Sequence, residues 1–268
     1  VGLSQAAYDE ALAYAKDRKQ FGKAIIEFPA VYDMLATIKA KLDAGRALLY
    51  QTSRYVDIYK ALDDIARERK LTPEERQEQK RYAKLADSFT PLAKGMNSEY
   101  ANQNAYDCIQ VHGGSGFMME YACQRIYRDA RITSIYEGTT QLQTVAAIRY
   151  VTNGAYAATL HEYELIPCAP EFEGYLNRIK DMTRKLEACT NAVKEAQNQE
   201  LLDFVARRLY EMAAVCVMSH LLLQDATKAP ELFAQSLNVY VNYAESEVEK
   251  HFNFIRKFNA EELASYRK

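Results

Sequence analysis

Apolar residues recur at spacings of three and four along most of the chain, which predicts an almost entirely helical protein. The first such stretch covers residues 2–17 and ends in a basic turn that contains a glycine. Two much longer stretches follow, one from Pro29 to Tyr59 and one from Pro73 to Val111. We therefore expect one helix of about four turns, followed by two long helices.

The segment between the two long helices, residues 67–81, is nearly all charged. Within it, Thr72-Pro73-Glu74-Glu75 has the features of a helix start: a threonine cap, a proline in the first turn and a glutamate that completes a capping box. A charged run of this kind is usually a solvated face. The segment therefore predicts the exposed tip of a helical hairpin, and we assign it no chemistry.

The helical period weakens after the third helix. A short helix is expected near residues 121–129, and residues 132–138 have no helical period. Another helix begins near Thr140, which forms a second capping-box match with Gln143. The pattern thus predicts an irregular segment directly before a capped helix.

Gly154 and residues 166–170 have the composition of a linker. Beyond it, the apolar period predicts three more helices, near residues 171–198, 199–227 and 230–257. The chain is therefore expected to be all-α, with one helical unit over residues 1–153 and a second, smaller helical unit over residues 154–268.

The composition is that of an ordinary globular protein. Hydrophobic residues make up 49% and charged residues 26% of the 268 positions, and the formal net charge is -2. This balance does not favour nucleic-acid binding, which calls for a basic surface. No apolar run reaches the roughly 20 residues of a membrane helix. The most apolar stretch, residues 213–223, is apolar on most sides, which favours burial in a core over membrane association.

The five cysteines are widely spaced, and none belongs to a CxxC pair. This spacing favours reduced thiols in a reducing compartment, such as the bacterial cytoplasm or the mitochondrial matrix. No second histidine or acidic residue stands at metal-binding spacing from His112, so no metal site is expected. Because the chain opens directly into an amphipathic helix without Met, we expect further protein to precede Val1.

Three short segments at predicted helix ends depart from a plain bundle: residues 18–22, 110–117 and 136–141. Helix ends leave backbone groups unpaired, so ligands can be held there. The three glycines of the second segment would let the backbone approach a ligand closely. Glycine at a helix end is also the usual cap residue, so the glycines alone do not decide between a cap and a binding loop.

Arg18 and Glu137 carry the candidate chemistry of these segments. Arg18 could pair with a phosphate in a bidentate manner, or it could only offset a helix dipole. Glu137 could likewise only compensate the dipole of the helix that follows it. Its aromatic and glycine neighbours would also suit a carboxylate that is short of water, as a general base near neutral pH requires. The residues themselves leave both alternatives open.

Taken together, the three segments resemble the C-terminal domain of the acyl-CoA dehydrogenase family over about residues 2–150. Arg18-Lys19-Gln20-Phe21-Gly22 is similar to the family's RxxFG turn, and Gln110-Val111-His112-Gly113-Gly114 is similar to its QxxGG motif. The RDARI at residues 128–132 and the IYEGT at residues 135–139 resemble its signature RDARI…IYEGT. The three motifs occur in the family's order on a helical background.

The resemblance implies a four-helix bundle that belongs to an FAD-dependent acyl-CoA dehydrogenase. Such enzymes oxidise an acyl-CoA thioester to the trans-2-enoyl-CoA. A carboxylate removes the α-proton while the β-hydrogen leaves as hydride to flavin N5, and the electrons pass to an electron-transfer flavoprotein. By resemblance Glu137 is the base. A weakly acidic α-proton requires a polarised carbonyl and a dry site around that base.

The resemblance also assigns ligand-binding residues. Tyr136 and Gly138 would flank the thioester, and Thr139 and Gln141 match positions that touch the flavin cofactor. A larger group matches positions that hold the FAD diphosphate and adenosine, typically across a subunit interface: Arg18, Gln20, Phe21, Gln110, Gly113 and Gly114. An arginine and exposed backbone N–H groups suit a diphosphate, and an aromatic ring suits adenine.

The part of the chain after residue 153 resembles the C-terminal extension of larger members, including the very-long-chain type and several bacterial enzymes. There the extension can cover surface used for tetramer assembly, so we expect a homo-oligomer, either a dimer or a tetramer. The family's N-terminal helical domain and middle β-domain would precede Val1. We therefore expect the isolated chain to have no dehydrogenase activity and weak or no FAD binding.

Two other interpretations stay open. An acyl-CoA oxidase or another relative would use the same base with a different electron acceptor. A non-catalytic helical interaction module would keep the bundle and use residues 154–268 as a docking surface.

Overall fold

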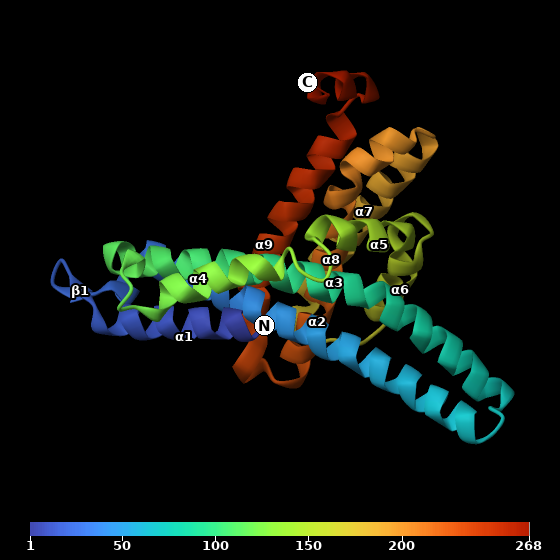
Figure 1. The fold of residues 1–268 in the computed structure, drawn as a ribbon, viewed down its shortest axis with the longest axis horizontal. Coiled ribbons are helices and arrows are strands. Elements are labelled where there is room, and N and C mark those ends of the chain that lie inside the picture. The colour runs from blue at the N-terminus through green and yellow to red at the C-terminus, as the bar shows by residue number, and fades with distance from the viewer. Residues whose placement is uncertain (268) are drawn as a thin grey trace.

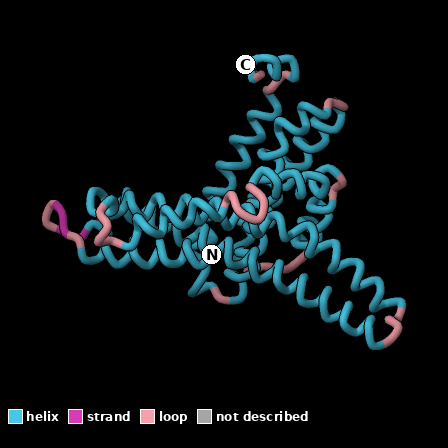
Figure 2. Tube along the Cα trace, viewed as in Figure 1, coloured by secondary structure: helices cyan, strands magenta, loops and turns pink. Residues whose placement is uncertain are grey.

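The computed structural model describes residues 1–267, which form nine α-helices joined by short turns (Figure 1). Within this range the only strands are two residue pairs, Lys19–Gln20 (β1) and Lys23–Ala24 (β2), which form an antiparallel hairpin at one end of the molecule (Figure 2). The expected all-α architecture is confirmed.

The four N-terminal helices form an elongated bundle (Figure 1). The outer halves of the second and third helices leave this bundle together as a long hairpin. The helices are α1 (Gly2–Asp17), α2 (Pro29–Glu68), α3 (Pro73–His112) and α4 (Ala122–Thr133). α4 begins where a short helix was expected and continues several residues beyond it.

The hairpin tip has the predicted capping box. The Thr72 hydroxyl accepts a hydrogen bond from the Glu75 N–H at 3.2 Å, and the Glu75 carboxylate accepts one from the Thr72 N–H at 2.9 Å. Arg69 also donates to both oxygens of Glu75. These hydrogen bonds, that from Arg69 first, lower the pKa of Glu75 to about 2. The charged segment therefore closes a solvated turn, as expected.

Five further helices follow: α5 (Thr140–Thr152), α6 (Ala155–Glu164), α7 (Glu173–Glu195), α8 (Gln199–Lys228) and α9 (Pro230–Lys257). The last three match the sequence expectation closely. The sequence reading missed α6, which lies between Gly154 and the expected linker at residues 166–170. A ten-residue helix is shorter than the window over which a helical period can be recognised.

The cap of α5 is Thr139, not Thr140 as the capping-box match predicted. The Thr139 hydroxyl accepts a hydrogen bond from the Leu142 N–H at 3.3 Å. Thr140 is the first helical residue, and its hydroxyl donates to Glu99 of α3 at 2.5 Å. The Gln143 side chain turns back toward the segment before the helix. Tertiary contacts to α3 have overridden the local capping pattern.

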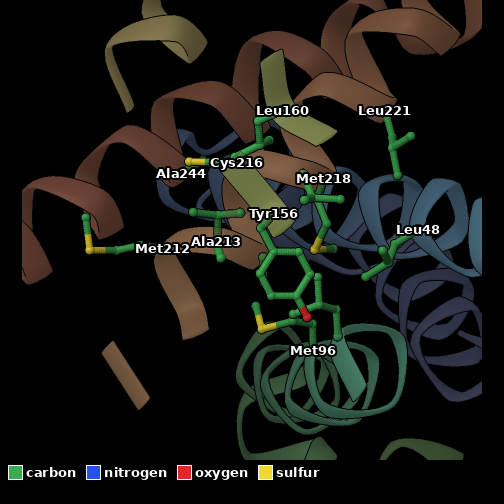
Figure 3. Close-up of a cluster of buried hydrophobic side chains, with 14 of the residues drawn as sticks. Leu48, Met96, Tyr156, Leu160, Met212, Ala213, Cys216, Met218, Leu221 and Ala244 are labelled. Carbon is green, nitrogen blue, oxygen red and sulfur yellow. The ribbon is translucent and has the colours of Figure 1, made fainter. Parts of the chain in front are cut away.

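The larger hydrophobic core joins both parts of the chain, since it contains side chains from α2, α3, α6, α8 and α9 (Figure 3). Every residue from Ala213 to Leu223 of α8 is buried, which confirms the burial expected for that stretch. A smaller core lies between α1, α3 and α4. None of the described helices is long and apolar enough to cross a membrane.

The C-terminal helices support α3 where that helix contains a proline, Pro91. A proline inside a helix removes one backbone hydrogen bond. The Tyr156 hydroxyl of α6 donates to the Ser88 carbonyl at 2.6 Å, and the Tyr210 hydroxyl of α8 donates to the Pro91 carbonyl at 3.0 Å. A Cβ on Gly95 would collide with the Tyr210 hydroxyl, so only glycine lets the two helices approach this closely. α8 therefore fixes the part of α3 that faces the candidate site.

Candidate active site

The turn that carries Glu137 connects α4 to α5 and has a strained backbone. Glu137 has a φ of 51° and Gly138 a φ of 90°, so both residues lie in the left-handed region. For a residue with a Cβ, this conformation costs about 1–2 kcal/mol. Such strain persists only where the surroundings hold it, and it clusters at functional sites. The turn is therefore a candidate site on backbone geometry as well as on its motif.

Two side chains hold this turn by its carbonyl groups. Lys94 of α3 donates a hydrogen bond from Nζ to the Gly138 carbonyl. Gln143 of α5 donates from Nε2 to the Glu137 carbonyl at 3.3 Å and to that of Gly138 at 3.5 Å. Burial lowers the pKa of Lys94, and the negative charge of Glu137 opposes that lowering. The Lys94 ammonium and the Glu137 carboxylate thus interact electrostatically.

A mainly apolar groove of about 470 Å³, which we call the Glu137 groove, opens beside the turn. Tyr136, Glu137 and Lys94 line it together with residues from the start of α1, from α2 and α3, and from the end of α4: Val1, Gly2, Leu3, Leu49, Thr52, Thr90, Ala93, Asn97, Ser98, Ala101 and Thr133. Thr139 and Gln141 lie outside it, exposed on the first turn of α5. The groove suits an apolar chain with a reactive group near the carboxylate.

A second groove, of about 480 Å³, contains the other predicted ligand residues, and we call it the Arg18 groove. Its lining brings together two segments that lie about ninety residues apart in the sequence: Arg18, Gln20 and Phe21 with Gln110, Gly113 and Gly114. Tyr14, Phe28 and His112 add aromatic surface. All six residues that the two motifs assigned to one ligand therefore meet in one place.

Arg18 is exposed and makes no ion pair with any residue in the range 1–267, so its guanidinium is available for an anion. Next to it, the β1–β2 hairpin turns through Phe21 and Gly22, with φ values of 49° and 83°. Left-handed values at both central residues are typical of the tight turn that matches strand twist. This turn leaves the Phe21 ring 89% exposed, as a stacking surface would require.

The glycine turn at the end of α3 differs in one respect from the expectation. The N–H of Gly113 bonds to the Gln110 carbonyl and is not exposed for a ligand. Gly113 is needed instead for its left-handed φ of 60°. His112 is buried and structural, because its ring stacks on Tyr14 at 4.2 Å and Nδ1 lies 2.8 Å from the Cys108 carbonyl. The turn thus presents glycine backbone and the Gln110 side chain to the groove.

The two grooves lie at opposite ends of α1, because its first residues line the Glu137 groove and its last turn lines the Arg18 groove. A helix of 16 residues is roughly 24 Å long. The structure therefore does not place Glu137 beside the Arg18 turn of the same chain. It separates the predicted base from the residues assigned to the diphosphate and adenosine.

Glu137 itself is exposed, so this chain does not supply the dry environment that a general base was expected to need. Lys94, Glu99 and Gln143 anchor the turn. The sequence pattern predicts Gln143 only as a capping-box partner of Thr140 and assigns no role to Lys94 or Glu99, which belong to no recognisable motif. Their role depends on the way α3 packs against the turn.

Two protein-family models match this chain. The family model described as "Acyl-CoA dehydrogenase, C-terminal domain" matches residues 1–151, more than half of the chain. The chain belongs to the acyl-CoA dehydrogenase family. A second family model, "Acyl-CoA dehydrogenase C terminal", matches residues 152–263. The family that the three motifs suggested is therefore confirmed.

Two curated relatives of this acyl-CoA dehydrogenase family member align with about half of it. Subunit CarC of the caffeyl-CoA reductase-Etf complex from Acetobacterium woodii is 37% identical over 143 residues, which are 53% of this chain and 31% of CarC. The 3-(aryl)acrylate reductase from Clostridium sporogenes is 35% identical over 143 residues, 53% of this chain and 32% of that protein. The chain thus spans about a third of the length of the curated relatives it matches.

A solved structure shares the fold over almost the whole chain. The acyl-CoA dehydrogenase from Bacillus anthracis, complexed with FAD, aligns with a TM-score of 0.74 and 21% identity. The alignment covers 99% of this chain and 48% of that protein. Both the bundle and the C-terminal helices therefore have a counterpart in a known fold.

No group of three or more His, Cys, Asp or Glu side chains that could hold a metal ion occurs in the part of the chain that the structure describes. The five thiols are free, and burial raises the pKa of Cys108 to about 12. The candidate chemistry therefore rests on the two grooves and on the carboxylate at the mouth of one of them.

Proposed function

We propose that this chain is the base-bearing C-terminal part of an FAD-dependent enzyme that dehydrogenates an acyl-CoA thioester between its α- and β-carbons. Glu137 removes the α-proton, and the hydrogen on the β-carbon leaves as hydride to flavin N5. The observation that supports this assignment best is the strained Glu137–Gly138 turn, held at the mouth of an apolar groove. Strain at a carboxylate beside an apolar groove fits a general base better than a dipole partner.

The Glu137 groove would receive the acyl chain next to the thioester. The surface of its walls is mostly apolar, and Tyr136 and Gly138 stand on either side of Glu137 in the sequence of the turn. Because Glu137 is exposed in this chain, the water-excluding cover has to come from other parts of the protein. We therefore expect the chain alone to bind FAD weakly or not at all and to have no dehydrogenase activity.

The Arg18 groove fits the diphosphate and adenosine of FAD. Arg18 has a free guanidinium, and Phe21 and Gln110 lie on the same groove. An arginine can hold a diphosphate in a bidentate manner, and an exposed aromatic ring can stack on a base. Thr139 and Gln141 would touch the flavin end, near Glu137. When bound, FAD supplies the hydride acceptor for the reaction.

Two chains would share each cofactor, since the two grooves of one chain lie roughly 24 Å apart along α1. The Arg18 groove of one subunit would then serve the Glu137 groove of another. The protein is accordingly a homo-oligomer, a dimer or a tetramer. We infer that it works in the bacterial cytoplasm, or in the mitochondrial matrix of a eukaryote.

The names of the relatives support an electron partner and leave two candidate directions for the reaction. CarC is named as a subunit of a complex with Etf, which supports an electron-transfer flavoprotein as the partner. Both relatives described above are named as reductases, so reduction of an enoyl-CoA by the same site is the second candidate. In that direction the Glu137 carboxyl group would return a proton to the α-carbon.

Replacement of the carboxylate tests the proposal. In the FAD-loaded protein that carries this chain, Glu137→Gln should slow anaerobic flavin reduction by acyl-CoA about 100- to 10,000-fold, with FAD retained. Glu120→Gln, an exposed glutamate in the loop before α4, is the control and should behave as wild type. A wild-type rate in Glu137→Gln would show that Glu137 is not the base and would favour a non-catalytic interaction module as the role of this chain. Rapid oxygen consumption by the wild-type protein with acyl-CoA would favour an oxidase.

A further inference from the structure

Lys94 is the one basic residue among those that line the Glu137 groove. It lies on α3, its ammonium donates to the Gly138 carbonyl, and it stands 5.8 Å from the centroid of the Tyr136 ring. Lys94 therefore interacts with three consecutive residues of the turn: with the ring of Tyr136, the charge of Glu137 and the carbonyl of Gly138. No other charged side chain in the described structure makes all these contacts.

The backbone of α3 at Lys94 is fixed from the other side. Gly95 packs directly under the Tyr210 hydroxyl of α8, which donates to the Pro91 carbonyl. Five residues along α3, Glu99 binds the Thr140 hydroxyl and lies 3.6 Å from Arg207 of α8. α3 thus holds both ends of the turn, and the C-terminal helix α8 holds α3.

We propose that Lys94 is a positioning residue for the reaction: it holds the left-handed Glu137–Gly138 turn, so that the Glu137 carboxylate faces the groove. This inference rests on the proposed function of Glu137. A left-handed glutamate returns to a more favourable backbone conformation unless the neighbouring carbonyls are held. Without the Lys94 hydrogen bond, only the longer bonds from Gln143 would hold those carbonyls. The carboxylate would then spend less time in reach of a bound α-carbon.

The same placement gives the C-terminal helices a function. They lie outside both grooves, yet Tyr210 and Arg207 of α8 support α3 on either side of Lys94. They would therefore preserve the geometry of the turn through α3 rather than contact the substrate. Their effect on the reaction would be transmitted through Lys94 and Glu99.

Stopped-flow flavin reduction in the FAD-loaded protein that carries this chain tests the inference, with the best substrate of a butyryl- to palmitoyl-CoA series. Lys94→Met should lower the limiting rate about 10- to 100-fold, the usual range for a lost hydrogen bond to a charged group. The half-saturating acyl-CoA concentration should stay within about threefold, since the Lys94 ammonium is bonded to the Gly138 carbonyl and all other residues that line the groove are unchanged. Lys94→Arg should restore most of the rate, because it can donate to the same carbonyl with the same charge.

The control is Lys84→Met, which removes an exposed lysine from the same helix and should leave the rate unchanged. If Lys94→Met loses FAD, Lys94→Gln is measured against the same criteria. A wild-type limiting rate in the Lys94 variant, or a loss confined to acyl-CoA affinity, overturns the inference. Glu137→Gln distinguishes the two hypotheses. If the Glu137→Gln protein reduces its flavin at the wild-type rate, the assignment of Glu137 as the base fails. If Glu137→Gln is slow while Lys94→Met reduces flavin at the wild-type rate, only the role of Lys94 is rejected.

Discussion

The contact between Gly95 and Tyr210 allows a quantitative test of the packing that supports the site. Alanine normally stabilises a helix interior relative to glycine by about 1 kcal/mol. Here a Cβ at position 95 would collide with the Tyr210 hydroxyl and come within 3.1 Å of its ring carbon Cζ. Tyr210 is fully buried and cannot move aside. We therefore expect Gly95→Ala to destabilise the protein.

The expected loss of unfolding free energy in Gly95→Ala combines two costs. Overpacking a tight core costs about 1–3 kcal/mol, and displacement of the Tyr210 hydroxyl from the Pro91 carbonyl costs about 1 kcal/mol more. After subtraction of the helix-propensity gain, Gly95→Ala should lower the free energy of unfolding by about 1–3 kcal/mol. Tyr210→Phe alone should cost about 1 kcal/mol. In the double variant the hydroxyl is gone, so its cost should fall short of the sum by about 1 kcal/mol or more.

Urea unfolding followed by far-UV circular dichroism measures all three variants. Gly45→Ala is the matched control, since the Cβ there would meet only the terminal amide of Asn97, the end of a half-buried side chain that can rotate away. Its cost should be well below that of Gly95→Ala. A Gly95→Ala protein that is as stable as wild type, or more stable, would show that α8 does not press on α3 near Lys94 as described.

Three other groups in the structure can be tested by substitution. Burial lowers the pKa of His220 from 6.5 to about 4, so the stability that the neutral ring contributes is full above pH 6.5 and falls by about 2 kcal/mol between pH 7 and 5. His220→Phe should remove this pH dependence from the urea unfolding midpoint, and an unchanged pH dependence would reject the prediction. The pKa of Glu75 is lowered to about 2, first by Arg69, so the stability that the carboxylate contributes is present above pH 4.5 and lost from there toward pH 2. Glu75→Gln should weaken the loss of unfolding free energy between pH 4.5 and pH 2, and a loss equal to that of wild type would contradict this. Arg18→Met should raise the dissociation constant for FAD at least about tenfold in the protein that carries this chain, as measured by flavin fluorescence, whereas Lys19→Met, beside it on β1, should not.

The helices could be predicted from the sequence because their apolar period is long and regular. α2 and α3 each extend over 40 residues, and their capped tip at Thr72 is a local pattern that no distant contact disturbs. α6 was missed because ten residues are too few to display a period. The cap of α5 was misplaced by one residue because Thr140 is drawn to Glu99, a contact that sequence spacing cannot reveal.

The candidate site, too, could be predicted from the sequence only in part. The Arg18 and Gln110 turns could be paired from their motifs, and the structure places them on one groove. The partners of the Glu137 turn could not be predicted, because Lys94 reaches Gly138 across 44 residues through the packing of α3. Neither the exposure of Glu137 nor the separation of the two grooves along α1 could be read from the motifs. Both depend on where helix ends lie in space.

Glu137 is the group that moves the α-proton in the proposed reaction, and this step can be measured without any hydride transfer. In D2O, an acyl-CoA analogue that carries α-protons but cannot lose a β-hydride should exchange its α-protons for deuterium on the FAD-loaded protein, as followed by proton NMR. The exchange would occur whichever way the overall reaction runs. We predict that Glu137→Gln abolishes the exchange with FAD still bound. An unchanged exchange rate in that variant would contradict the account.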